Sequence, residues 1–329
     1  MPTPPGELPP ALSDSFGYAQ ARRAGVSARR LRGRDLDAPF YGVRRRAAGD
    51  PFADGDDAPL ARDRAIRARV IRDAVAYSAV MSPNAFFVGR TAAVLLGLPA
   101  SHGDKLDVGV FAPRRAPRGR GIQGRALSSD FVSVGIIENL RVASPASTWA
   151  TLGTVLTERE LVRLGDAAVR IPRDDRGVPR PERRLATLDQ LRAAIEVGRR
   201  PGTVRLRTAL ARVRVGSMSP LETDARLNTE EAGLPEAELD VEIRNAGGRL
   251  HGIADMRYRR YRVLVEVEGD HHRTDRRQWT RDIEKQAAYA AEGYETVRLT
   301  GLQIRQHPER GVALVRGALI RGGWKPGGA

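Results

Sequence analysis

The segment Gly252–Leu299 constrains the fold of this chain more than any other stretch. An expected strand around Asp255 is followed by a turn rich in arginine and tyrosine, and then by a second expected strand over Tyr261–Glu268. The residues after this strand predict a helix from about Arg277 to Glu292 and a closing strand over 295–299. Strands and a helix in one stretch predict an α/β fold whose mixed sheet is flanked by helices.

Acidic residues gather where the second of these strands ends. Side chains two positions apart on a strand share a face, so Glu266 and Glu268 point the same way. If the two strands pair as a hairpin, Asp255 comes near them. Carboxylates this close repel one another, and a hard divalent cation with oxygen ligands relieves the repulsion. The pattern therefore favours a site for Mg²⁺ or Mn²⁺ suited to phosphodiester hydrolysis.

Asp255, the run Glu266-Val267-Glu268-Gly269 and His272 resemble the nuclease core of the PD-(D/E)XK superfamily, and within it the very-short-patch-repair-like endonucleases. The resemblance covers about the last third of the chain. It implies a restriction-endonuclease-like fold in which Asp255 and Glu266 bind the metal and Val267 lends its carbonyl. Glu268 stands where the superfamily usually has lysine, which leaves open what activates the water.

The resemblance also assigns His272, or less readily His271, as general base or leaving-group acid. Asp282 has two interpretations. It forms a helical ion pair with Lys285, one turn along the helix, or it orients His272 from behind.

Glu222 opens the expected C-terminal domain in the sequence Ser219-Pro220-Leu221-Glu222. Ser219 is a good N-cap, Pro220 fits the first helical position, and an acid in the first turn is favoured by the helix dipole. In the nuclease superfamily an acid from the first core helix often joins the metal site. Glu222 is therefore a candidate site residue, with a purely helix-capping role as the alternative.

A helix, a glycine turn and a second, Ser27-capped helix to about Arg34 form a helix-turn-helix pattern near the N-terminus. The sequence FYGVRRR after it predicts a wing strand. The second helix would present Arg29, Arg30 and Arg32 to DNA, and a solvated arginine-rich helix pair is the alternative. This stretch resembles the winged-helix N-terminus of AbiEi-type antitoxins, in which that module binds DNA.

The composition is strongly basic, with a net charge of +15, and it contains no cysteine. Asp14–Arg46 holds nine Arg against three Asp, whereas Glu222–Glu242 holds eight acids and one Arg. Uneven charge of this kind favours DNA as a partner, although a high-GC genome also enriches arginine. The absence of cysteine, of a signal peptide and of a long apolar run predicts a cytoplasmic protein without a membrane partner.

The sequence suggests five segments. They are a disordered tail (1–13), a winged helix-turn-helix (14–48), a mixed α/β middle domain like that of AbiEi proteins (58–170), a linker with helices (171–215) and the nuclease-like domain (216–329).

Two functions are compatible with this organisation. The first is a metal-dependent DNA endonuclease with an N-terminal DNA-binding module. The second is an antitoxin-like DNA-binding regulator whose nuclease fold is inactive. A homodimer and a cognate toxin both remain open as partners.

Overall fold

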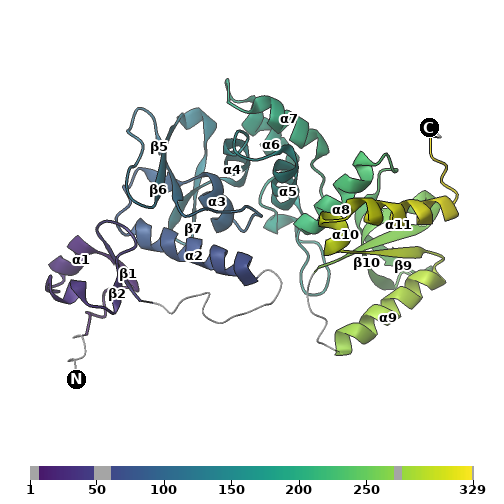
Figure 1. Ribbon diagram of the computed structural model, residues 1–329, viewed down its shortest axis with the longest axis horizontal. Helices are drawn as coiled ribbons and strands as arrows, with labels where there is room; N and C mark the ends of the chain where they lie inside the picture. The colour runs from purple at the N-terminus through teal and green to yellow at the C-terminus, as the bar shows by residue number, and fades with distance from the viewer. Residues whose placement is uncertain (1–6, 48–60, 270–275, 328–329) are drawn as a thin grey trace. The chain divides into compact units, whose positions relative to one another are not determined.

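The computed structural model describes residues 7–47, 61–269 and 276–327 of the 329-residue chain (Figure 1). The chain divides into two compact units. The first comprises Met1–Leu156 with Asp189–Leu206, and the second comprises Thr157–Leu188 with Arg207–Ala329. Both units combine helices with a β-sheet, which confirms the predicted α/β class.

The first unit begins with a small sheet and a short helix. Its elements are β1 (Ser15–Gly17), α1 (Tyr18–Arg23), the 3-10 turn Arg30–Arg32, β2 (Leu36–Asp37) and β3 (Val43–Arg46). The sheet order is β1-β3-β2, and β3 lies where the wing strand was predicted. The second helix, expected from Ser27 to about Arg34, is only the 3-10 turn. Ser27 does cap it, since its hydroxyl accepts a hydrogen bond from the Arg30 amide at 3.1 Å.

The lack of apolar anchors explains why the second helix stays short. Leu31 is the only fully buried side chain between Ser27 and Arg34. A short helix needs an apolar face packed on the core to offset its nucleation cost, and one leucine does not supply it.

The rest of the first unit is a mixed sheet packed on helices. Its elements are α2 (Ala61–Ser78), β4 (Ala85–Phe87), α3 (Gly89–Leu95), β5 (Leu106–Phe111), β6 (Ile122–Leu127), β7 (Val134–Ile137), β8 (Leu140–Ala143), α4 (Pro145–Thr151) and α6 (Leu188–Glu196). The strand order is β6-β5-β4-β8-β7. On α2, Val70 and Ala74 are buried, whereas Ile71 and Val75 are exposed. The apolar residues of α2 lie on two adjacent stripes, and one of them faces the core.

The N-terminal elements share a core with the α/β elements that follow. Phe40 and Val43 belong to the same buried cluster as Val70 and the sheet strands. The Phe40 ring meets the Tyr77 ring edge-on, with centroids 5.2 Å apart. The segment that holds Phe40 and Val43 is therefore packed into the first unit.

The second unit is built on a mixed sheet with the order β12-β11-β10-β9. Its elements are α5 (Glu158–Val169), α8 (Pro220–Glu231), β9 (Glu238–Arg244), β10 (Leu250–Tyr258), β11 (Val263–Glu268), α9 (Arg276–Ala291), β12 (Glu295–Thr300), α10 (Gly301–Arg305) and α11 (Pro308–Arg321). The helix α7 (Thr203–Arg212) begins in the first unit and ends in the second.

Both faces of this sheet are covered by helices (Figure 1). Strands β9, β10 and β11 are antiparallel neighbours, and β12 runs parallel to β11. One face packs against α8, α10 and α11 through a cluster that includes Val265 and Leu299. The other face carries Leu264 and Ala254 against Tyr289 of α9. The predicted strand–strand–helix–strand unit is confirmed.

No helix in the described ranges is long and apolar enough to cross a membrane.

Candidate active site

Asp255 and Glu266 are neighbours across two adjacent strands. The register of β10 and β11 pairs Met256 with Val265, and the next positions along the two strands are Asp255 and Glu266. Beyond Met256 the regular ladder stops, and the Oδ2 of Asp255 accepts a hydrogen bond from the backbone N–H of Val267 at 2.6 Å. A side chain thus takes the place of a backbone acceptor, which fixes the Asp255 carboxylate between the strands.

The surroundings of Asp255 favour its neutral form. Burial raises the pKa of this carboxyl, while the Val267 hydrogen bond and the Lys285 charge oppose the rise. The carbonyl of Val267, predicted as a metal ligand, belongs to the peptide plane that follows the one bonded to Asp255. Its assigned role stays a prediction.

Glu222 takes part in the cap of α8, and its role as a site residue stays a prediction. Ser219 caps α8 by accepting a hydrogen bond from the Glu222 amide at 3.2 Å, and the Oε2 of Glu222 accepts one from the Met218 amide at 2.7 Å. These reciprocal bonds confirm the capping interpretation. Burial, together with the negative charge of Asp255, also raises the pKa of Glu222 to about 7. Glu222 therefore lies within electrostatic reach of the predicted metal ligand.

A buried ion pair fixes the helix that carries Glu222. Asp166 of α5 accepts a hydrogen bond from Arg226 of α8 at 2.8 Å and another from Thr223 at 2.9 Å. The Asp166 and Arg226 side chains are only 1% and 3% exposed. A pair this deeply buried tolerates little change in geometry, so α5 holds α8, and with it Glu222, in place.

Lys285 of α9 lies beside the predicted metal ligands, whereas the sequence had suggested for it only an ion pair with Asp282. Its ammonium nitrogen lies 3.0 Å from the Oε2 of Glu266 and 3.1 Å from the carbonyl oxygen of Ile253. Lys285 thus faces the sheet, and its helical ion pair with Asp282 stays a prediction. Burial raises the pKa of Glu266 to about 7, although the Lys285 charge opposes the rise.

Gly252 of β10 makes room for this lysine. A Cβ at position 252 would lie 2.8 Å from the Cε of Lys285 and 2.6 Å from the hydroxyl of Tyr289. Tyr289, one helical turn after Lys285, is fully buried against the sheet. The spacing of Lys285 and Tyr289 was the available signal, since residues four apart share a helix face.

Glu268, the third acid of the motif, is paired with a cation. Arg298 of β12 donates to its carboxylate. In the parallel ladder Arg298 stands beside Glu266, and its side chain extends along the strands to Glu268. Two cationic side chains therefore contact the acids of β11. Arg298 contacts Glu268, and Lys285 contacts Glu266.

His271 and His272 lie outside the described residues, so the proposed orientation of His272 by Asp282 also stays a prediction. Within the described ranges, no group of three or more His, Cys, Asp or Glu side chains is arranged to hold a metal ion. Asp255 and Glu266 nevertheless offer the hard oxygen donors that Mg²⁺ prefers. The Oε1 of Glu266 is buried and has no hydrogen-bond partner among the described residues, which leaves one carboxylate oxygen available as a ligand.

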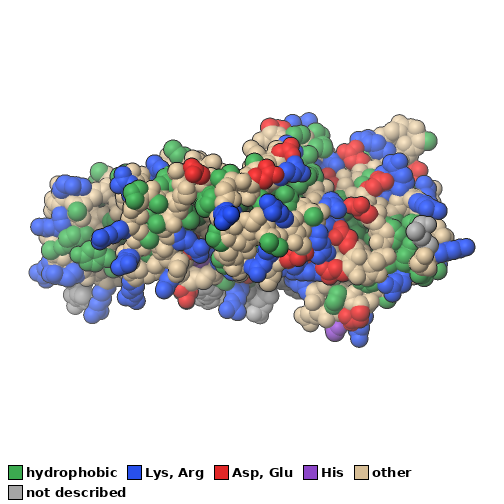
Figure 2. Space-filling view, turned by 90° about the horizontal axis from the view of Figure 1, so that it is seen from above, with side chains coloured by type: hydrophobic (Ala, Val, Ile, Leu, Met, Phe, Trp, Pro, Cys, Tyr) green, Lys and Arg blue, Asp and Glu red, His purple; other side chains and the backbone are tan. Residues whose placement is uncertain are grey.

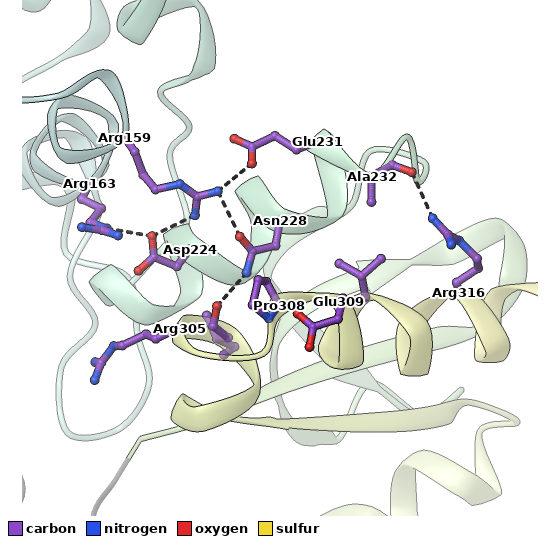
Figure 3. A pocket seen from close by; sticks show the side chains of 12 residues that line it. Arg159, Arg163, Asp224, Asn228, Glu231, Ala232, Arg305, Pro308, Glu309 and Arg316 are labelled. Carbon is purple, nitrogen blue, oxygen red and sulfur yellow. Dashed lines mark hydrogen bonds and ion pairs between the residues drawn. The ribbon is translucent and has the colours of Figure 1, made fainter.

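A separate cavity of about 750 Å³ lies among α5, α8, α10 and α11 (Figure 3). The charged groups on its α5 and α8 side are engaged with one another. Arg159 bonds to Asp224, Asn228 and Glu231, and Arg163 bonds to Asp224 at 2.7 Å. None of the predicted site residues lines this cavity. It is a paired polar network that supports α8, and the acids lie elsewhere on the unit.

The predicted DNA-contacting arginines differ in availability. Arg29 and Arg32 are exposed, whereas Arg30 forms a two-pronged ion pair with Asp35 at 2.5 and 2.9 Å. This pair lowers the pKa of Asp35. Arg29 and Arg32 therefore remain as the phosphate contacts that we propose for the winged segment.

Comparison with family models, with curated proteins and with solved structures gives no match to this chain.

Proposed function

We propose that the protein is a metal-dependent DNA endonuclease whose second unit hydrolyses phosphodiester bonds and whose first unit grips DNA. The observation that carries the proposal is the contact of Lys285 with Glu266 beside Asp255. Two adjacent buried carboxylates with a lysine are the groups that metal-assisted attack on a phosphate requires. The carboxylates bind the cation, and the ammonium faces the anionic phosphate.

Each residue has a distinct task in this proposal. Asp255 and Glu266 would hold Mg²⁺ or Mn²⁺, which supplies an acidified water and neutralises charge on the phosphate. Burial raises the pKa of Glu266 to about 7, so a cation held by Glu266 would favour its ionised form and displace the proton to solvent. Lys285 stabilises the deprotonated Glu266 and then donates a hydrogen bond to a water or phosphate oxygen. In this proposal Lys285 provides the cation that Glu268 does not.

Glu222 and Glu268 have supporting tasks. Glu222 shares the electrostatic environment of Asp255, so its ionisation changes the affinity of Asp255 for a cation. Glu268 is held by Arg298 at the end of β11 and fixes the edge of the site. His272 keeps its proposed role as general base or leaving-group acid.

The experiment is plasmid nicking by the full chain with Mg²⁺ or Mn²⁺. Asp255→Asn and Glu266→Gln remove the negative charge of each ligand but keep its shape, and both variants should lose metal-dependent nicking. Glu309→Gln, which removes an exposed carboxylate from the same unit, is the matched control and should cleave normally. Undiminished metal-dependent nicking by Asp255→Asn would show that the assignment is wrong.

The antitoxin-like regulator is the second candidate. The observation in its favour is that Asp255, Glu266 and Glu222 each have a protein donor among the described residues. A fold with this arrangement is stable without a cation. DNA binding that is unaffected by Mg²⁺, together with an absence of cleavage in every variant, would favour this candidate.

A further inference from the structure

A groove of about 870 Å³ lies in the first unit between α1, the turn that joins β2 to β3, the end of α2 and the loop that precedes β6. Arg23, Arg32, Arg44 and Arg120 line it, together with Tyr41. None of the described residues that line it is acidic. In the view of Figure 2, the end of the molecule that holds the N-terminal elements carries many basic and few acidic side chains.

The four arginines of the groove fall into two groups. Arg44 belongs to its wall, because its Nε donates to the Leu31 carbonyl at 2.7 Å and its guanidinium stacks 5.3 Å from the Tyr18 ring centroid. Arg23, Arg32 and Arg120 are exposed, and their guanidinium groups form no hydrogen bond or ion pair within the described part of the chain. By contrast, Arg45 is neutralised by Asp73 at 2.7 Å. Three uncompensated guanidinium groups around one hollow attract an anion.

Tyr41 presents its ring to solvent at the edge of the groove. The turn around it closes through a hydrogen bond from the Val43 amide to the Phe40 carbonyl at 3.1 Å, and Gly42 takes the left-handed φ of 76° that this turn needs. The turn directs Phe40 inward and Tyr41 outward, with exposed fractions of 7% and 98%. An aromatic ring this exposed has a free face on which a nucleic-acid base can stack.

The floor of the groove is rigid. Gly121, next to Arg120, approaches the Phe40 ring so closely that a Cβ there would lie 3.0 Å from it. Gly17 and Gly42 lie in ordinary contact range of Val80, just after α2. Phe40 is itself part of the unit's core, so the chain beside Arg120 and the chain beside Tyr41 both pack on one buried ring. A site formed before binding avoids the entropic cost of ordering it.

We propose that this groove binds a single-stranded segment of nucleic acid, with backbone phosphates on Arg23, Arg32 and Arg120 and one unstacked base on Tyr41. The volume falls in the range of pockets that take small ligands or single nucleotides, and a duplex is too wide to enter it. The bases of a duplex are also stacked on one another, so none would offer a face to Tyr41. The proposal deepens the DNA-gripping half of the proposed function, and it is independent of the metal site.

The test measures binding of the full chain, in a chelator that prevents cleavage, to labelled oligo-dT of about twelve nucleotides. A blunt duplex and oligo-U of the same length serve as comparisons. Tyr41→Ala should weaken oligo-dT binding by about 5- to 100-fold, the effect of losing one base–aromatic stack, and leave duplex binding unchanged. Tyr41→Trp should retain affinity and show fluorescence quenching when the strand binds.

The arginines are tested through the salt dependence of the same binding. The triple variant Arg23→Gln, Arg32→Gln, Arg120→Gln should reduce the slope of log affinity against log salt by about 2, as expected for three lost contacts to a single strand. The control variant Arg176→Gln, Arg183→Gln, Arg199→Gln removes the same charge from exposed positions outside the groove and should leave the slope unchanged.

Each outcome decides for or against the groove. Equal slopes in the two triple variants would show attraction to total charge only, and the proposal would fail. It would also fail if Tyr41→Ala bound oligo-dT like the wild type, or if the wild type bound the duplex more tightly than oligo-dT. Tighter binding of oligo-U than of oligo-dT would support the groove and identify RNA as its strand. If the wild type bound oligo-dT as expected but did not nick DNA with Mg²⁺ or Mn²⁺, only the proposed nuclease activity would be rejected, and the groove proposal would stand.

Discussion

The ammonium nitrogen of Lys285 lies 3.0 Å from a carboxylate oxygen of Glu266, and both side chains are largely shielded from solvent. The lysine comes from α9 and the acid from β11, so the contact depends on how the helix packs across the sheet. The same contact therefore affects both the proposed chemistry of the second unit and its folding stability.

Removing the lysine should therefore destabilise the protein in a pH-dependent way. Lys285→Met leaves Glu266 buried without its cation, which should cost about 1–3 kcal/mol of unfolding free energy at pH 8. At pH 5 the cost should be smaller, because the pKa of Glu266 is already about 7 and the carboxyl is neutral there. Denaturant unfolding at the two pH values measures the difference. The double variant Lys285→Met, Glu266→Gln should recover most of the loss at pH 8, and equal losses at both pH values would contradict the prediction.

Glu222 should make the metal-free protein less stable as pH rises. Its pKa is about 7 in the fold against an ordinary value of 4.5, so the folded state binds more protons than the unfolded state between these values. Stability contributed by the protonated form is present at pH 4.5 and is lost as pH rises through 7. Glu222→Gln keeps an oxygen for the Met218 amide and should reduce this fall by about 1–3 kcal/mol. An unchanged pH profile in denaturant unfolding, with chelator present, would show that Glu222 is not buried beside a charge.

Divalent cations should stabilise the full chain and release protons. Millimolar Mn²⁺ or Mg²⁺ should raise the melting temperature, since a ligand at a hundredfold excess over its Kd adds about 2.7 kcal/mol. Asp255→Asn should abolish the shift. Glu268→Gln should reduce it less, because Arg298 already neutralises Glu268. Calorimetry at pH 6 in two buffers of different ionisation enthalpy should show proton release. A melting curve that neither cation moves would favour the regulator.

Truncation of the adjacent residues Phe40 and Tyr41 should change the stability of the protein by very different amounts. Phe40→Ala removes a buried ring from the core of the first unit and should cost about 3–5 kcal/mol. Tyr41→Ala removes an exposed ring and should change stability by less than about 0.5 kcal/mol. Thermal unfolding of both variants measures this. If Phe40→Ala were as stable as the wild type, the winged segment would not be integral to the unit.

Local patterns in the sequence predicted the elements of the second unit well. The strands β10 and β11, the helix α9 and the strand β12 follow from alternation and from helical spacing, which neighbouring residues determine. The helix expected after Ser27 failed because propensity and a cap were present without a sufficient apolar face. Helix formation there was decided by tertiary packing.

The site was less predictable than the fold. Asp255 and Glu266 are adjacent in register, as the hairpin implied, but the partner of Lys285 is set by a contact between residues 19 positions apart. The sequence offered only a one-turn pair with Asp282, whereas the buried Tyr289 on the same helix face accompanies Lys285 against the sheet. The groove could not be predicted from the sequence, because Arg23 and Arg120 lie far apart in the chain and line one groove, with Phe40, only in the folded unit.

The order in which the two units are assembled from the chain has a consequence for synthesis. The chain leaves the first unit after Leu156, returns for Asp189–Leu206 and then completes the second unit. During translation the first unit is complete once residue 206 has emerged, whereas α5 must wait for α8 to cover it. The unit for which we propose nucleic-acid binding is therefore finished on the ribosome before the unit for which we propose cleavage.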